Sequence, residues 1–283
     1  MSRDFGREFD HEVDEILDYL RDNGKLIAEY DALSYPPSAA LIPAGVELII
    51  VPGAFYREYP RHEARGERLK ASAEKLGITA TILDTPSFCS PAAGAECLTR
   101  HLSQISPSRA PIVVSLSKGA LDTVRFLQDP RNSALLDRIR AWITLSGIVV
   151  GTPLINYIDQ RLLLKMAVRL SLWRRGYRYR DLLELRQVSS TDDISTLSSR
   201  MPFPILHVQG FPYYKDLSSS LARKGALRLK SHGASDGGGI ILRGTKDYPG
   251  GIIAIKRADH YLSNARLEGL IISSLTRAVS QIM

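Results

Sequence analysis

A serine lies where the sequence changes from a strand pattern to a helix pattern. Residues 110–114 form a continuous apolar run, and residues 120–127 carry apolar side chains at helical spacing. Between them lies the segment 115–119, SLSKG, which predicts a sharp turn. A hydroxyl at the apex of such a turn stands clear of its neighbours, as a nucleophile requires. Ser117 is therefore the candidate nucleophile.

A serine hydroxyl is a weak nucleophile at neutral pH, so it needs a base, and the base needs an acid to hold its tautomer. His260 follows a late apolar strand pattern and lies far downstream of Ser117, so we choose it as the base. His232, in a glycine-rich region, is a competitor. His207 lies inside a strand pattern, which favours a buried structural role.

Four aspartates compete for the role of the acid. Asp236 lies in the glycine-rich loop before His260 and is our first choice. Asp216 opens an expected helix, where a capping role also explains it, and Asp247 is also explained as a turn residue. Asp259 adjoins His260 in the chain and is a poor partner for orienting its ring. The order of preference is Asp236, then Asp216, then Asp247.

Apolar runs alternate with amphipathic helical patterns along most of the chain. We expect strands at 46–51, 78–83, 112–116, 141–147, 203–210 and 252–256, and helices at 61–76, 92–103, 118–128, 133–140 and 216–230. Continuous runs of Val, Ile and Leu between helices are typical of a parallel sheet that is covered on both faces. The pattern therefore predicts an α/β fold.

Two segments depart from this alternation. Apolar residues at helical spacing predict an amphipathic helix over residues 4–30, within an N-terminal unit of residues 1–35. Residues 152–200 are mostly helical in pattern and interrupt the sheet, so we interpret them as a cap or lid. The core then comprises residues 36–151 and 201–283.

The predicted cap is basic as well as apolar. Residues 161–180 contain seven Arg or Lys and no Asp or Glu, interleaved with large apolar side chains. Such a helix can close a hydrophobic acyl pocket while its basic face meets an anionic substrate group, a membrane surface or an acyl carrier. The alternative is a packed helix whose arginines are simply solvated.

The composition excludes several other classes. Hydrophobic residues make up 44% and charged residues 24% of the 283 residues, as in soluble globular enzymes. The two cysteines form no disulfide framework, and no nucleotide-binding motif or metal-ligand cluster is present, so we expect neither a cofactor nor a metal.

The basic residues behind the net charge of +7 are not arranged as in any nucleic-acid-binding module, so nucleic acid is not an expected partner. Without a signal-peptide pattern or a long apolar run, the expected location is cytoplasmic.

The segment 115–119 resembles the G-x-S-x-G motif of the α/β-hydrolase fold superfamily, and within it the serine esterases and lipases. Ser115 stands where that family has its first glycine, and Gly119 keeps the second. The segments around Asp236 and His260 are similar to the acid and histidine loops of bacterial lipase-like members. The resemblance implies a mostly parallel central sheet flanked by helices, with a helical cap inserted after the strand at 141–147.

The resemblance also implies an oxyanion hole, formed by the backbone N–H of Lys118 and that of Ala54 or Phe55. The expected substrate is a small acyl compound, hydrophobic and in part anionic. Its predicted binding residues are Gly53, Tyr56, Leu116, Tyr157 and Met166.

The implied activity is that of a serine hydrolase that cleaves a carboxylic ester or thioester through a Ser117-His260-Asp236 triad and an acyl-enzyme. Two alternatives stay open. The same acyl-enzyme serves an acyltransferase or a chain-releasing thioesterase, and a hydrolase scaffold can also act as a ligand-binding protein without turnover.

Overall fold

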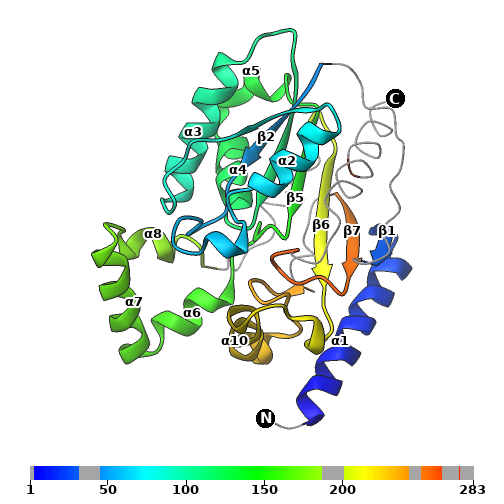
Figure 1. The fold of residues 1–283 in the computed structure, drawn as a ribbon, viewed down its shortest axis with the longest axis vertical. Coiled ribbons are helices and arrows are strands. Elements are labelled where there is room, and N and C mark those ends of the chain that lie inside the picture. The colour runs from blue at the N-terminus through cyan, green and yellow to red at the C-terminus, as the bar shows by residue number, and fades with distance from the viewer. Residues whose placement is uncertain (1–2, 32–44, 187–200, 242–249, 263–273, 275–283) are drawn as a thin grey trace.

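Seven strands form one parallel sheet in the computed structural model, which describes residues 3–31, 45–186, 201–241, 250–262 and 274 (Figure 1). The strand order is β1-β7-β6-β5-β4-β2-β3, and every neighbouring pair is parallel. The strands are β1 (Leu26–Asp31), β2 (Val46–Val51), β3 (Thr79–Ile82), β4 (Ala110–Leu116), β5 (Ala141–Leu145), β6 (Ile205–Phe211) and β7 (Gly251–Lys256). The predicted α/β class and parallel sheet are confirmed.

Helices surround the sheet and follow the predicted alternation. They are α1 (Arg3–Asp22), α2 (Glu67–Lys75), α3 (Pro91–Gln104), α4 (Gly119–Gln128), α5 (Ser133–Leu136), α6 (Pro153–Asp159), α7 (Leu162–Arg174), α8 (Tyr179–Leu183) and α10 (Ser220–Leu229). Short 3-10 turns lie at η1 (Pro60–His62), η2 (Pro130–Asn132), η3 (Tyr214–Asp216) and η4 (Lys230–His232). The helix expected at 61–76 is therefore η1 plus α2, and the one expected at 216–230 begins only at α10.

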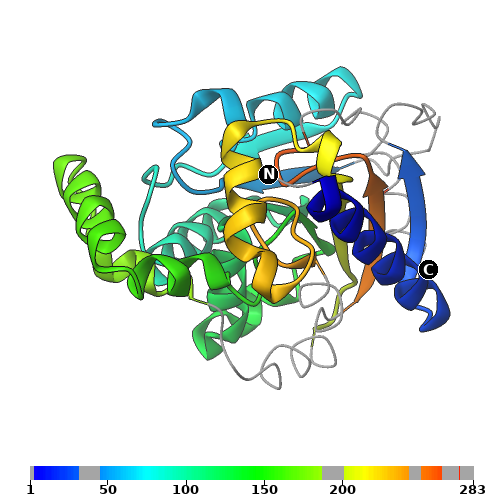
Figure 2. The ribbon, with the colours of Figure 1, turned by 90° about the horizontal axis from the view of Figure 1, so that it is seen from below.

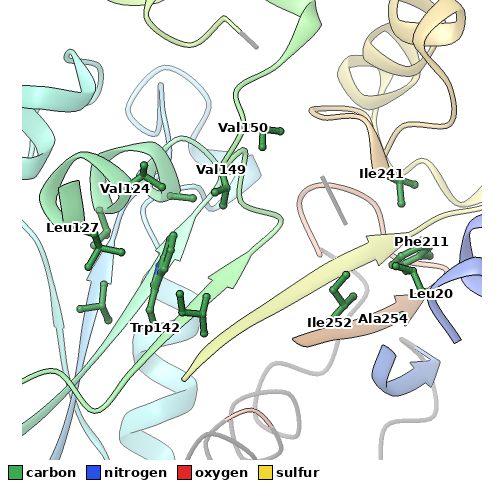
Figure 3. Packing of buried hydrophobic residues seen from close by; sticks show 14 of the residues in the cluster. Leu20, Val124, Leu127, Trp142, Val149, Val150, Phe211, Ile241, Ile252 and Ala254 are labelled. Atoms are coloured by element: carbon green, nitrogen blue, oxygen red, sulfur yellow. The ribbon is translucent and has the colours of Figure 1, made fainter. Parts of the chain in front are cut away.

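The strand period of two divides the core between the two faces of the sheet. Val113 of β4 packs in a cluster with residues of α1, α3 and α4, whereas its neighbours Ile112 and Val114 pack in a second cluster with α2. Ile252 and Ile253 of β7 divide in the same way. Figure 3 shows part of the first cluster, which runs from Val124 and Trp142 to Phe211 and Leu20. Because both faces are covered, the strands read as continuous apolar runs.

The N-terminal segment differs from the prediction of a helix over residues 4–30. The helix α1 ends at Asp22, and Gly24 follows it with φ of +64°. The next residues form β1, which lies at the edge of the sheet and pairs with β7. The backbone N–H and C=O groups of β1 pair with those of β7, a strand from the other end of the sequence. Because this pairing exists only in the folded chain, the local sequence pattern did not show that the helix ends before β1. These residues are therefore part of the central sheet.

The predicted cap is helical where the structure describes it. It consists of α6, α7 and α8, and its remaining part, residues 187–200, lies outside the described residues. Figures 1 and 2 show α7 at the periphery of the molecule, to one side of the sheet. Among the described helices, none combines the length and apolar character needed to cross a bilayer.

The packing of α1 on the sheet generates a stability prediction. Leu20 has 0% of its surface exposed, so Leu20→Ala should lower the free energy of unfolding by about 2–5 kcal/mol through lost burial and a residual cavity. Urea denaturation measures this change. Leu162→Ala is the matched control: Leu162 is 70% exposed, and the same truncation there should change stability by less than about 0.5 kcal/mol. Equal effects of the two variants would contradict a structural role for α1.

Candidate active site

Ser117 lies on a sharp turn between β4 and α4. Its φ of +47° is in the left-handed region, which a residue with a side chain adopts only where the surroundings impose it. The Ser117 N–H donates to the carbonyl of Leu145 at 3.1 Å. A Cβ atom on Gly119 would lie 2.5 Å from the carbonyl oxygen of Val51, so only glycine fits there. The tight contact between the start of α4 and the end of β2 thus holds the turn.

Ser115 fills the position where the family motif has glycine. It lies in β4 and is fully buried, and its Oγ accepts a hydrogen bond of 2.8 Å from Nε1 of Trp142. Trp142 lies in the neighbouring strand β5 and is itself fully buried. A buried indole N–H needs an acceptor, and a serine hydroxyl supplies it. This contact accounts for the departure from the motif.

Three predicted side chains meet above the carboxyl ends of the strands. The Oγ of Ser117 lies 2.8 Å from Nε2 of His260. The Nδ1 of the same ring lies 2.9 Å from Oδ2 of Asp236. Both distances are those of hydrogen bonds, so the three groups form one continuous chain from hydroxyl to imidazole to carboxylate. They come from segments that are far apart in the sequence.

Asp236 is buried but well supplied with donors. Its Oδ1 accepts from the N–H groups of Gly238 and Gly239, at 2.9 and 2.8 Å. Its Oδ2 accepts from Nε2 of Gln209 at 2.8 Å, in addition to the contact with His260. Burial alone raises the pKa of Asp236, but the charge of His260 and these hydrogen bonds outweigh it, so the pKa lies below its usual value. The carboxyl is therefore held as a carboxylate.

His260 is oriented by its backbone as well as by its ring. Its N–H donates to the carbonyl of Asp236 at 2.8 Å. The ring packs against Gly238, where a Cβ atom would lie 2.6 Å from three ring atoms. Burial alone lowers the pKa of His260, but the charge and hydrogen bond of Asp236 reverse this, so its pKa lies above the usual value. Asp236 thus increases the affinity of the ring for a proton.

The competing residues lie elsewhere. Asp259 accepts from the N–H and Oγ of Ser218, and Asp216 accepts from the N–H of Tyr213 in a capping arrangement. His232 is exposed in η4. His207 is fully buried in β6, with Nδ1 2.8 Å from Oγ1 of Thr144, as the strand pattern indicated. Asp247 lies outside the described residues.

The two predicted sides of the oxyanion hole meet near Ser117. Neither the Lys118 N–H nor the Ala54 N–H has an acceptor among the described residues. The N–H of Phe55 donates to the carbonyl of Ser87 at 2.7 Å, so it is not available to a substrate. Of the two expected donors in this loop, Ala54 is therefore the one whose N–H is free within the described part of the chain.

The side chain of Lys118 is buried rather than exposed to a ligand. Its Nζ lies 2.7 and 2.8 Å from the two carboxylate oxygens of Asp122, one helical turn further along. It also lies 3.4 Å from Sγ of Cys89. Burial raises the pKa of Asp122 to about 7 despite the charge of Lys118, and burial likewise raises the pKa of the Cys89 thiol. The pair anchors the residue whose backbone N–H follows the nucleophile.

A cavity of about 390 Å³ opens at Ser117 and His260. Its wall is largely aliphatic and comes from the cap and from the loops after β4 and β5, with Ile148, Ile155, Ile158, Val168, Leu172, Leu182 and Leu185. Besides the buried Lys118, charged side chains also line it: Glu58, Glu63, Arg68, Arg175 and Arg228. The shape and lining suit a ligand with an apolar part.

The structure brings one of the five predicted substrate residues to the cavity. Leu116 lines the cavity, whereas Gly53, Tyr56, Tyr157 and Met166 do not. Gly53 donates to the carbonyl of Ala64, and the buried Tyr56 hydroxyl donates to the carbonyl of Thr85. Tyr157 packs under the guanidinium of Arg161, and Met166 is exposed on α7. The backbone of Gly53 and the side chains of Tyr56 and Tyr157 are engaged with the protein, and Met166 is exposed, which their sequence positions did not reveal.

Several cavity residues had no signal in the sequence. Glu58 accepts hydrogen bonds of 2.6 Å from both Ser87 and Tyr177, and so connects the loop after β2 to the cap. His62 stacks on Tyr261, with ring centroids 4.2 Å apart, beside the catalytic candidates. These contacts join residues from distant segments, so no spacing rule predicts them. Within the described ranges, no group of three or more His, Cys, Asp or Glu side chains is placed to hold a metal ion.

The buried ion pair beside the nucleophile leads to a second prediction. Asp122→Ala leaves the ammonium of Lys118 buried without a counter-charge and should lower the free energy of unfolding by about 3–5 kcal/mol. The double variant Lys118→Met with Asp122→Leu removes both charges and should recover most of that loss. Denaturant unfolding measures both. Asp18→Ala is the control, because its pair with Arg21 is exposed and its loss should leave stability unchanged. A stable Asp122→Ala variant would contradict this account.

Known proteins are similar to this chain in structure and not detectably in sequence. The sequence matches no protein-family model and no curated protein. The metagenomic carboxyl esterase MGS0156 superposes with a TM-score of 0.67 at 18% identity, over 97% of this chain and 91% of that one. The mature lipase BlEst2 of Bacillus licheniformis superposes with a TM-score of 0.58 at 16% identity, over 86% of this chain and 94% of that one. Together with the parallel sheet and the turn at Ser117, these likenesses show that the chain has the α/β-hydrolase fold.

Proposed function

We propose that this protein is a serine hydrolase that cleaves a carboxylic ester or thioester. The observation that carries the proposal is the hydrogen-bonded chain from Ser117 through His260 to Asp236, with the hydroxyl facing an apolar cavity. A carboxyl esterase and a lipase share the fold, which agrees with this activity. Nucleophile, base and orienting acid all lie within hydrogen-bond reach, which favours catalysis over ligand binding alone.

The geometry supports a two-step mechanism. The Oγ of Ser117 attacks the carbonyl carbon of the substrate while Nε2 of His260 accepts the hydroxyl proton. The resulting oxyanion is stabilised by the N–H groups of Lys118 and Ala54. His260 then gives the proton to the departing alcohol or thiol, which leaves an acyl group on Ser117. Water, activated by the same ring, attacks the acyl-enzyme and releases the acid.

The cavity points to a substrate with an apolar acyl group. Aliphatic side chains of the cap and its neighbouring loops form most of the wall, and burial of a hydrocarbon chain against them is favourable by about 0.8 kcal/mol for each CH₂. Arg175 and Arg228 stand in the same wall, where a carboxylate or phosphate on the substrate would meet a cation. The proposed substrate is thus an ester or thioester with an apolar chain and an anionic part.

The role of the nucleophile gives the direct test. Ser117→Ala should lower kcat/KM for p-nitrophenyl butyrate by at least about a thousandfold, since the attacking group is lost. The same variant should no longer be labelled by an active-site fluorophosphonate. Ser108→Ala, at an exposed serine, is the matched control and should retain full activity and labelling. Undiminished turnover and labelling in Ser117→Ala would refute the proposal, and transfer of the acyl group to an added alcohol in preference to water would redirect it to an acyltransferase.

The raised pKa of His260 predicts the pH dependence. Only the neutral ring accepts a proton, so kcat/KM should fall as the pH decreases through the pKa of His260, which lies above its usual value. Asp236→Asn removes the charge that raises this pKa while burial remains, so the acidic limb should move to lower pH. Activity should also fall by about a thousandfold or more, because the ring loses its orienting acceptor.

A comparison variant sharpens this pH test. Asp259 is also close enough to raise the pKa of His260, but its effect is the smallest and its carboxylate contacts Ser218 instead of the ring. Asp259→Asn should therefore move the acidic limb less than Asp236→Asn does and should retain more activity. A pH profile that is the same in Asp236→Asn and the unaltered protein would contradict the assignment of Asp236.

A further inference from the structure

The cap helix α7 exposes an unusual amount of apolar surface. Leu163 is 85% exposed and Trp173 is 73% exposed, and Leu162, Met166 and Leu170 are exposed as well. These are five of the seven large apolar side chains that are exposed in the described part of the chain. Figures 1 and 2 show the helix at the edge of the molecule.

The exposed side chains lie on one side of the helix. Leu163, Met166, Leu170 and Trp173 are spaced by three, four and three residues. At about 100° per residue, these four positions fall within an arc of about 80°. The result is a continuous apolar stripe about 15 Å long, given a rise of about 1.5 Å per residue. We call these four residues the outer stripe.

A second apolar face of α7 points the other way. Leu164, Val168 and Leu172, spaced by four residues, pack with Ile155, Ile158 and Leu182. Val168 and Leu172 also line the cavity at Ser117. This inner face accounts for how α7 is held on the protein, and the outer stripe has no part in this cluster of described residues.

Basic side chains border the outer stripe. Arg169 lies on one flank and Arg174 on the other, given about 100° per residue. Both are exposed, and neither forms an ion pair with an acid among the described residues. The segment 161–180 as a whole carries seven basic residues and no acid. Three of the seven, Lys165, Arg178 and Arg180, pair with Asp159 or Asp181, so the positive charge beside the stripe is that of Arg169 and Arg174.

We propose that α7 docks this protein on an anionic lipid surface. The outer stripe enters the boundary between headgroups and acyl chains, and Arg169 and Arg174 pair with lipid phosphates. The helix then lies in the plane of the interface. Because the inner face of α7 forms a wall of the cavity, the docked protein holds its acyl-binding cavity one helix thickness, about 10 Å, from the lipid.

Lipid fits this surface better than a folded protein does. Side chains as exposed as Leu163 and Trp173 stand out from a convex helix, and a fluid acyl layer accommodates them without a matching groove. The uniform sign of charge along the helix favours a surface whose charge is also uniform and negative. Docking does not depend on the proposed hydrolase chemistry, because none of the residues in the outer stripe lines the cavity.

Flotation of the full-length protein with lipid vesicles tests the proposal. The protein should partition onto vesicles of phosphatidylcholine with phosphatidylglycerol at least about tenfold more strongly than onto phosphatidylcholine alone. Arg169→Glu with Arg174→Glu should weaken partitioning onto the anionic vesicles by about 25-fold or more, at roughly fivefold for each basic residue lost. The matched control is Arg100→Glu with Arg125→Glu, which makes the same charge change on α3 and α4 and should bind nearly as the unaltered protein does.

Removal of apolar side chains tests insertion separately. Leu163→Ser with Trp173→Ser should weaken partitioning by at least about tenfold, because two exposed apolar groups no longer enter the lipid. Circular dichroism checks that each variant is folded. The Ser117→Ala protein should bind vesicles as well as the unaltered protein, so failure of the proposed enzymatic activity would leave this measurement intact.

Tryptophan fluorescence emission reports directly whether the side chain of Trp173 enters the lipid. The chain has two tryptophans, of which Trp142 is fully buried and Trp173 is exposed. Anionic vesicles should shift the emission to shorter wavelength, and lipids with brominated acyl chains should quench it. Trp173→Phe should abolish the shift and still bind the vesicles. Any change that remains in Trp173→Phe would come from Trp142 and would count against insertion of α7.

The outcomes separate the possible occupants of this face. Binding to anionic vesicles that requires both the basic flanks and the outer stripe supports the proposal. Absence of binding to either vesicle, or binding that the Arg169→Glu, Arg174→Glu variant retains, overturns it. The proposal would also be overturned if the protein does not bind vesicles but forms dimers in light scattering, and if Leu163→Ser with Trp173→Ser makes it monomeric. That result would assign the outer stripe to contact with a second copy of the chain.

Discussion

The close approach of α4 to the end of β2 is the constraint on which the site depends. Gly119 lies so near the carbonyls of Val51 and Pro52 that no side chain fits, and this contact holds Ser117 in its left-handed conformation. The same contact brings the loop after β2, with Ala54, beside the nucleophile. One steric requirement therefore sets both the exposure of the hydroxyl and the position of the backbone donors that face a substrate oxygen.

Two buried aspartates near this turn show how neighbouring groups determine the pKa of a carboxyl group. Asp236 accepts hydrogen bonds from two backbone N–H groups, from Gln209 and from His260, and its pKa is lowered. Asp122 has Lys118 as its partner, and burial raises its pKa to about 7. Both are buried aspartates, but at Asp236 the charge of His260 together with several hydrogen-bond donors outweighs burial, whereas at Asp122 the charge and hydrogen bond of Lys118 alone do not. The first is held as a charged acceptor for His260, and the second secures the backbone around Lys118.

The cap combines two apolar faces on one helix. The inner face of α7 packs on the cap and closes the cavity, and the outer stripe stays exposed among basic residues. A helix that only had to pack would need one apolar face. The second face is the feature from which we propose docking on a lipid surface.

Local patterns in the sequence were sufficient for the class of fold, for the turn at Ser117 and for the choice of His260 as its neighbour. Apolar strand runs, helix spacing and a motif of five residues are local patterns, so they can be read from the sequence without knowing which distant segments come into contact. The sequence ranked Asp236 above Asp216 and Asp247 but left all three open as the acid, and the folded structure brings the carboxylate of Asp236 to His260 while that of Asp216 accepts from Tyr213. The tertiary structure also placed β1 in the sheet, engaged Phe55 with Ser87 and turned Met166 outward. Each of these outcomes depends on how segments that are far apart in the sequence pack together. Packing determines which hydrogen bonds form and which side chains are buried, and the spacing of residues along the chain does not.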